Sequence, residues 1–185
     1  MPRRKIPDDF YDRIRPRLLE RIGRDLRLAY RVLDIGCGRC GLGEFLNARY
    51  HQRVTGVDTA GGKLPKPRRR RKHQGTLRCI RADASKLGFL KRASLDAAVS
   101  MWSLHEMARP LQVLRQVRRK LRPGGKLLIV DFPSRSLAQR RWNENYYTLT
   151  ELKALLIKAG FEEVRVRMQE RRQVLWATGW CPARS

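Results

Sequence analysis

The sequence predicts a doubly wound α/β fold with a seven-stranded sheet, mostly parallel, and an antiparallel hairpin of strands at the C-terminal end. Short apolar runs typical of strands alternate along the chain with amphipathic stretches of helical length. This alternation is typical of a parallel sheet covered by helices on both faces. The first strand also runs into a glycine-rich turn, Gly36 to Gly41, followed by a helix. That order of elements builds the cofactor sites of nucleotide-binding folds.

The chain length and composition indicate one globular domain over 1–185, with an N-terminal helical segment over 1–29 and the core over 30–180. No apolar run approaches the roughly 18 residues that a membrane span needs. The N-terminus carries no apolar stretch of a secretory signal. Four cysteines are too few for a disulfide scaffold, so we expect a reduced, cytoplasmic protein. The sequence leaves the oligomeric state open.

The N-terminal half of the chain predicts two helices and two strands. Asp8 to Leu28 has apolar residues at spacings near four and predicts a helix that Pro16 should kink or split. We expect a strand over 31–35, a helix over 42–50 and a strand over 54–57.

The alternation of strands and helices is interrupted once in the middle of the chain. The segment 61–75 holds paired glycines, two prolines and a run of arginines, and predicts a basic loop or a short helix. Strands are expected over 77–81 and 95–100. A helix over 110–121 has a proline in its first turn, where the missing N–H costs nothing.

After this helix, Arg122 to Gly125 predicts a turn, and 126–132 predicts a fully apolar strand in the middle of the sheet. A polar loop is expected over 133–147. A capping box at Thr148 opens a helix over 151–159.

The chain closes with the predicted antiparallel pair of strands, over 161–168 and 172–178.

Acidic residues follow the strands at the positions where a cofactor would need them. Asp58 ends the second strand 20 residues after Gly38, and its carboxylate suits the two hydroxyls of a ribose. Asp83 follows the third strand and could accept from an adenine amino group, while the Ala84 N–H donates to a ring nitrogen. The fourth strand ends in the segment Ser100 to Glu106. The carboxyl ends of parallel strands share one edge, where ligands bind in such folds.

With these motifs in order, the chain resembles the class I S-adenosylmethionine-dependent methyltransferases, and most closely the branch that includes ubiquinone and menaquinone biosynthesis enzymes. The resemblance covers roughly residues 30–168 and rests on six motifs: Leu33 to Gly38, Gly56 to Asp58, Ala82 to Ala84, Leu95 to Ser100, Leu121 to Leu127, and Thr150 to Glu162. It implies a Rossmann-like fold, with S-adenosylmethionine as cofactor and S-adenosylhomocysteine as product. We expect no metal.

The resemblance and the spacing together give the following candidate cofactor-binding residues: Asp34, Gly36, Cys37, Gly38, Cys40, Asp58, Asp83, Ala84, Ser100, Met101 and Trp102. The sequence departs from the family pattern at two places. Cys40 stands where the third glycine of the loop is usual, and the basic segment 61–75 replaces a helix.

Cys37 and Cys40 also form a Cys-x-x-Cys at a strand-to-helix turn, as in thioredoxin-type redox sites. This alternative leaves Asp58 and Asp83 unexplained. Zinc is no better supported, because Cys79 and Cys181 are isolated in the sequence.

His105 and Glu106 are the candidate catalytic residues, since the resemblance places them beside the reactive end of the cofactor. His105 is either a general base or a residue that shapes the pocket and caps the next helix. Trp102 is expected to pack against the cofactor. The 133–147 loop mixes charge with aromatics and suits either a lid over the acceptor or a solvated loop. Its candidate residues are Arg135, Arg140, Arg141, Trp142, Asn143, Tyr146 and Tyr147.

The net charge of +25, from 42 Lys and Arg against 17 Asp and Glu, leaves the acceptor open. The closest motif resemblance favours a small-molecule acceptor. The charge and the basic run over 63–73 favour RNA or a ribonucleoprotein, although an arginine-rich composition can also arise without selection for binding. The third hypothesis is a non-catalytic basic binding protein that kept the fold.

Overall fold

The computed structural model describes residues 6–60 and 76–183, so the predictions for 61–75 and for the basic run over 63–73 lie outside the described residues. The helices are α1 (Phe10–Asp25), α2 (Gly41–Tyr50), the 3₁₀ helix η2 (Leu104–Glu106), α3 (Pro110–Lys120), α4 (Leu137–Trp142) and α5 (Leu149–Lys158). The strands are β1 (Arg31–Ile35), β2 (Arg53–Asp58), β3 (Leu77–Arg81), β4 (Leu95–Met101), β5 (Leu121–Asp131), β6 (Glu162–Gln169) and β7 (Val174–Trp180).

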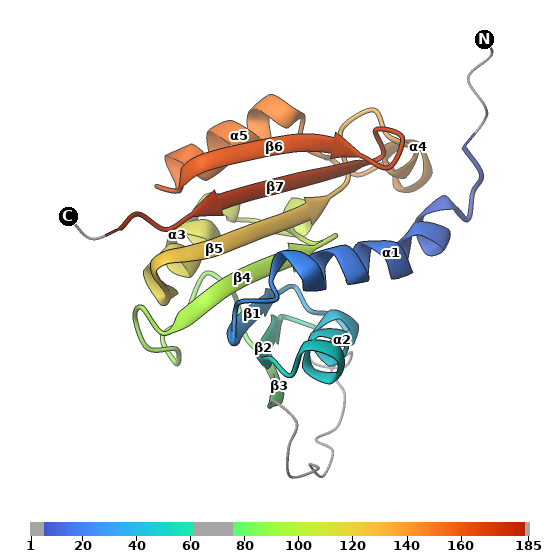
Figure 1. The fold of residues 1–185 in the computed structure, drawn as a ribbon. Coiled ribbons are helices and arrows are strands. Elements are labelled where there is room, and N and C mark those ends of the chain that lie inside the picture. Colours follow the sequence, from blue (N-terminus) through green and yellow to red (C-terminus); the bar gives the residue numbers. More distant parts are fainter. Residues whose placement is uncertain (1–5, 61–75, 184–185) are drawn as a thin grey trace.

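The strands form a single seven-stranded sheet in the order β3-β2-β1-β4-β5-β7-β6, which confirms the predicted fold class (Figure 1). The first five strands pair in parallel, and β7 runs antiparallel to both β5 and β6. The chain winds outward from β1 to β3 and then crosses back to β4 on the other side of β1. Ligands bind in such sheets outside the carboxyl ends of the strands at this reversal point.

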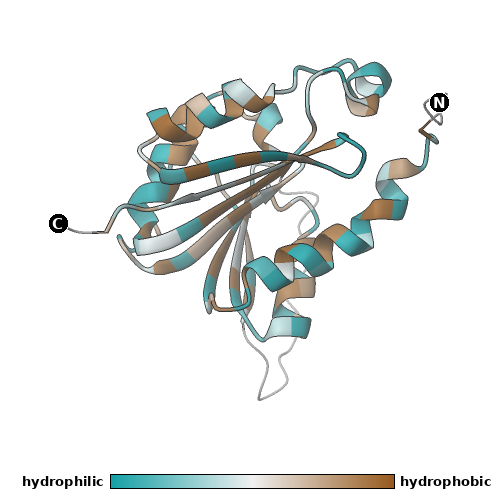
Figure 2. Cartoon of the chain, turned by 45° about the horizontal axis from the view of Figure 1, so that its top comes forward, coloured by the Kyte–Doolittle hydropathy of each residue, from teal (hydrophilic) through white to brown (hydrophobic). Residues whose placement is uncertain are grey.

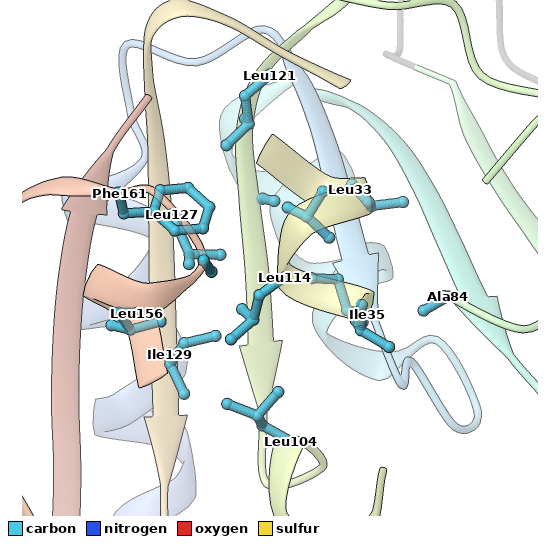
Figure 3. Packing of buried hydrophobic residues seen from close by; sticks show 14 of the residues in the cluster. Leu33, Ile35, Ala84, Leu104, Leu114, Leu121, Leu127, Ile129, Leu156 and Phe161 are labelled. Carbon is cyan, nitrogen blue, oxygen red and sulfur yellow. The ribbon is translucent and has the colours of Figure 1, made fainter. Parts of the chain in front are cut away.

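Both faces of the sheet are covered, and strands β1 and β4 and the second half of β5 are buried on both sides (Figure 2). In β5, Leu127 and Ile129 belong to the core on the α3 and α5 face, which Figure 3 shows together with Leu114 and Leu156 from those helices. The alternate residues of β5 pack on the opposite face with residues of α1 and α2.

Helix α1 runs from Phe10 to Asp25 through Pro16, so the chain is not split there as the sequence suggests. Pro16 is exposed, whereas Ile14, Leu18 and Ile22 are buried on the face against the sheet. Burial of that apolar face outweighs the single backbone hydrogen bond that proline removes.

Two further expectations need correction. The 133–147 segment contains a helix, α4, whose N-cap Ser136 accepts a hydrogen bond from the Gln139 N–H. The predicted turn at Arg122 to Gly125 lies within β5, which begins at Leu121 and pairs irregularly with β4 before a regular register starts at Lys126. The other predicted helices and strands are confirmed to within three residues at each end.

Among the described helices, none combines the length and apolar character required to cross a bilayer.

Candidate active site

The glycine loop after β1 and the tip of β4 are joined by two serines. Ser103 Oγ donates to the Ile35 carbonyl at 2.8 Å and lies 2.7 Å from Ser100 Oγ, and both serines are buried. Gly36 has φ +68°, and a Cβ there would lie 2.4 Å from Ser103 Oγ. Only glycine accepts this backbone conformation without cost and lets Ser103 approach so closely.

Beside this junction, a cavity of about 650 Å³ opens at the carboxyl edge of β1 to β4; we call it the edge pocket. Its lining residues come from four strand ends and the segment after β4: Gly36, Gly38, Val57, Asp58, Thr59, Ala82, Asp83, Ala84, Ser85, Lys86, Trp102, Ser103, Glu106, Met107, Ala108, Arg109 and Val113. Its volume is in the usual range for a site that binds a small molecule.

Seven of the thirteen candidate site residues line the edge pocket: Gly36, Gly38, Asp58, Asp83, Ala84, Trp102 and Glu106. The six that do not line it are Asp34, Cys37, Cys40, Ser100, Met101 and His105. Sequence reasoning missed Ser103, Met107 and Arg109. Ser103 lies within the Ser100 to Glu106 segment and could have been included from its position alone.

Asp58 lines the edge pocket, and both of its carboxylate oxygens accept hydrogen bonds from backbone N–H groups. Oδ2 accepts from the Gly38 N–H and Oδ1 accepts from the Ala60 N–H, each at 2.8 Å. A carboxylate has room for about four hydrogen bonds, so both oxygens retain acceptor capacity. Gly38 has φ +52°, and a Cβ there would have no protein atom within 4 Å. The loop therefore leaves open space beside an acid that can accept further hydrogen bonds.

Asp83 is exposed at the far side of the edge pocket. Its Oδ1 accepts from the Ser85 N–H at 2.8 Å. Hydrogen bonds from the Ser85 N–H and hydroxyl hold the pKa of Asp83 below its ordinary value. Asp83 is therefore ionised at neutral pH and available as an acceptor beside Ala84.

Asp34 lies beneath the loop, and only 2% of its surface is exposed. Burial raises its pKa to about 7, the backbone N–H of Gly43 opposes that shift, and the Asp58 charge adds to it. Within the described part of the chain, Asp34 Oδ2 has no hydrogen-bond partner. Asp34 is not among the residues that line the edge pocket. Met101 likewise packs into the core on the α1 and α2 face.

Cys40 occupies the third glycine position with φ +60°, the left-handed conformation that glycine ordinarily provides. Its sulfur forms a disulfide with Cys79 of β3. The expectation of isolated, reduced cysteines is therefore wrong for this pair. Gly56 of β2 makes the contact sterically feasible, because a Cβ there would meet the sulfurs of Cys37 and Cys40 at 2.9 and 3.0 Å.

The thioredoxin-type alternative is not favoured by the environment of Cys37. Burial, and then the nearby charges of Asp34 and Asp58, raise the pKa of this thiol to about 12. A redox-active thiol at a helix N-terminus needs the opposite shift. Cys37 Sγ does lie 3.4 Å from Cys40 Sγ, but Cys40 is bonded to Cys79.

His105 is held by Asp131, the last residue of β5, which is fully buried. Asp131 Oδ1 lies 2.7 Å from His105 Nδ1, and Oδ2 accepts from the His105 backbone N–H at 3.1 Å. The opposite ring nitrogen, Nε2, lies 3.2 Å from Glu144 Oε2 and 3.9 Å from Glu106 Oε1. The His105 ring is thus fixed by a buried acid on one side and faces two exposed acids on the other.

Burial of His105 lowers its pKa, but the hydrogen bond and charge of Asp131, with the charges of Glu106 and Glu144, raise it more, so its net pKa lies above the ordinary value. Burial and the Glu144 carboxylate also raise the pKa of Tyr146, whose hydroxyl donates to Glu144 Oε2 at 2.9 Å. His105, Glu106 and Glu144 bring three atoms of metal-ligand type within 4.8 Å of one another. The absence of a metal stays a prediction.

Phe132, which follows Asp131, is the centre of an aromatic cluster beside His105. Its ring centroid lies 4.7 to 5.6 Å from those of the other four members, Tyr11, Trp102, Trp142 and Tyr146. Trp102 lines the edge pocket, and Trp142 belongs to α4. Of the predicted lid residues, Trp142 and Tyr146 therefore join the cluster, while Arg135, Arg140 and Arg141 line a separate cavity with α4.

We expect Gly36→Ala to lower the free energy of unfolding by about 2–4 kcal/mol, because it combines a left-handed alanine with displacement of the Ser103 hydrogen bonds. Gly38→Ala is the matched control. It has the same backbone penalty and no clash, and should cost about 1 kcal/mol. Urea unfolding of both variants measures the difference, and equal losses would contradict the proposed close approach of Ser103.

The raised pKa of His105 predicts a pH-dependent stability. A group whose pKa is raised on folding contributes stability that is complete below its unfolded pKa, about 6.5, and is lost as the pH rises through the folded value. The difference in unfolding free energy between the wild type and His105→Asn should therefore shrink as the pH rises above about 6.5 and through the raised pKa of His105. A difference that grows with pH would contradict the assignment.

Comparison with known proteins matches residues 33–129 to a family model described as a methyltransferase domain. Methyltransferase GfsG of Streptomyces halstedii is 30% identical over 122 residues, which are 65% of this chain and 43% of that protein. Ubiquinone biosynthesis O-methyltransferase of Dinoroseobacter shibae is 31% identical over 122 residues, 63% of this chain and 49% of that protein. The chain spans less than half the length of these two relatives.

Among solved structures, the [4+2]-cyclase SpnF superposes with a TM-score of 0.72 at 19% identity, over 91% of this chain and 81% of that one. At this identity the likeness shows the fold alone. The family model covers more than half of the chain, and its span holds the glycine loop, Asp58, Asp83 and His105. The chain therefore belongs to the methyltransferase domain family, within the class I S-adenosylmethionine-dependent methyltransferases.

Proposed function

We propose that this protein transfers a methyl group from S-adenosylmethionine to a small-molecule acceptor and releases S-adenosylhomocysteine. The observation that supports this most directly is the edge pocket, where a glycine loop, Asp58 and Asp83 meet at the reversal point of the sheet.

The residues present fit the cofactor. The open space over Gly38 can accept a ligand against the loop backbone, and Asp58 retains acceptor capacity for the two ribose hydroxyls. Asp83 and Ala84 lie across the pocket, where an acceptor and an N–H donor suit the edge of an adenine. Trp102 lines the pocket on the side of the aromatic cluster and would contact the methionine end.

The cofactor supplies a methyl group on a positively charged sulfur, which leaves readily in an in-line displacement. The protein's main contribution is therefore alignment of the acceptor. The aromatic cluster provides flat apolar surface beside Trp102 for an acceptor ring.

His105 is the residue we assign to proton removal where the acceptor atom is a hydroxyl. Asp131 fixes the proton on Nδ1 and stabilises the imidazolium, so Nε2 is the basic atom. The carboxylates of Glu144 and Glu106 lie beside Nε2, so both must move away before the acceptor hydroxyl can reach that nitrogen. Because the pKa of His105 is raised, this activity should increase as the pH rises through that pKa.

The assignment of a small-molecule acceptor is supported by relatives such as the ubiquinone biosynthesis O-methyltransferase of Dinoroseobacter shibae. The net charge of +25 supports the alternative of an RNA or ribonucleoprotein acceptor, and a non-catalytic binding protein is the third candidate. The cytoplasmic location stays a prediction.

Calorimetry with S-adenosylhomocysteine tests the cofactor site. We expect Asp58→Ala to weaken binding by about 1–3 kcal/mol, since a hydrogen-bonded carboxylate is lost. Glu44→Ala removes an equal charge from an exposed site on α2 and should bind like the wild type. Failure of the wild type to bind would leave only the non-catalytic candidate.

Incubation with methyl-labelled S-adenosylmethionine and a cell extract, followed by separation of RNA from metabolites, identifies the acceptor class. We expect label in the metabolite fraction, and loss of that label in Asp58→Ala. Label in RNA alone would exclude a small-molecule acceptor and favour the alternative.

A further inference from the structure

A second cavity at the same edge of the sheet is lined by five arginines, Arg135, Arg140, Arg141, Arg171 and Arg172, and has a volume of about 1330 Å³. We call it the arginine groove. Among its described lining residues, Asp8 is the only acid. Five positive charges against one make the groove strongly attractive to anions.

Four of the five groove arginines have no carboxylate partner among residues 6–60 and 76–183. These four are Arg135, Arg140, Arg141 and Arg172. The guanidinium of Arg141 donates to the backbone carbonyl of Asp8, which leaves its charge uncompensated. Like charges held around one cavity repel one another, and a bound anion would relieve that repulsion.

The walls of the groove are held in place by a buried side chain. Gln173 is 8% exposed, and its Oε1 accepts from the Leu137 N–H at 2.7 Å. The Tyr11 hydroxyl also donates to this oxygen, at 3.4 Å. These hydrogen bonds tie α4 and α1 to the β6–β7 turn, where Arg171 and Arg172 have φ of +56° and +65°. The arginines from both walls therefore face one cavity in the folded chain.

The groove lies next to the aromatic cluster. Figure 1 shows α4 and the β6–β7 turn on the side of the sheet where β4 and β5 end. Trp142 follows Arg141 in α4, is 44% exposed and stacks on Tyr11 at 5.6 Å. The edge pocket, the aromatic cluster and the arginine groove thus follow one another along this edge.

We propose that the arginine groove binds the anionic end of the methyl acceptor, a phosphate or carboxylate group remote from the methylated atom. This inference rests on the proposed function for its identification of the ligand as an acceptor. Guanidinium groups bind both anions through paired hydrogen bonds. Leu137, Leu149 and Met168 add apolar lining, which favours a compact small molecule over a nucleic acid backbone.

Calorimetry of the full chain with inorganic pyrophosphate and, separately, citrate, in about 0.15 M salt, tests the groove and separates the two anion types. The variant Arg140→Gln/Arg172→Gln removes one charge from each wall. The control Arg49→Gln/Arg115→Gln removes two charges from exposed positions on α2 and α3. Binding of S-adenosylhomocysteine is measured in all three proteins.

We expect the groove variant to lose at least tenfold in affinity for pyrophosphate or citrate, while the control changes less than twofold and both still bind S-adenosylhomocysteine. Equal losses in the two variants, or no binding of either anion by the wild type, would overturn the proposal. An RNA 10-mer that binds the wild type tenfold more tightly than either anion, and depends on the groove arginines, would also overturn it. If the wild type does not bind S-adenosylhomocysteine at all, the proposed function is refuted, while the measured affinity of the groove for anions still stands.

Discussion

The arrangement of residues around His105 depends on one buried carboxylate. Asp131 is fully buried at the end of β5 and accepts three hydrogen bonds, from His105 Nδ1, from the His105 backbone and from the Phe132 backbone. A buried charge is tolerated only when it is satisfied in this way. The same carboxylate therefore orients the only histidine near the edge pocket among the described residues, anchors η2, and directs Phe132 into the centre of the aromatic cluster.

The two cavities suit different ligands: we propose that the edge pocket binds the cofactor and that the arginine groove binds the anionic end of the acceptor. The edge pocket holds backbone groups, small residues and two acids, which suit a cofactor with many hydroxyl and amino groups. The arginine groove holds cations and apolar side chains. The aromatic cluster connects the two cavities, because Trp102 lines the edge pocket and Tyr11 is hydrogen-bonded to Gln173 of the groove. An acceptor bound in the groove would therefore extend along the cluster toward the His105 ring.

The strands, and the class of a mostly parallel sheet with a C-terminal antiparallel hairpin, could be predicted from sequence because apolar runs, glycines and caps are local signals. The helix α4 was missed because it has only six residues and no apolar period, and its stability comes from the Ser136 cap and from burial of Leu137 and Ala138. The site was predicted in part. Asp58 and Asp83 follow their strands directly, whereas the His105–Asp131 and Cys40–Cys79 pairs join residues 26 and 39 positions apart. No local pattern encodes such contacts.

The contact between Gly36 and Ser103 has a consequence for how this chain can change. The glycine loop and the segment after β4 pack so closely that a Cβ added to Gly36 would lie 2.4 Å from Ser103 Oγ. A loop transplanted from a relative will therefore fit only if the residue at position 103 is transplanted with it. The two segments, 67 residues apart, are therefore coupled by packing, and a chimera that divides them should lose both the loop conformation and the pocket.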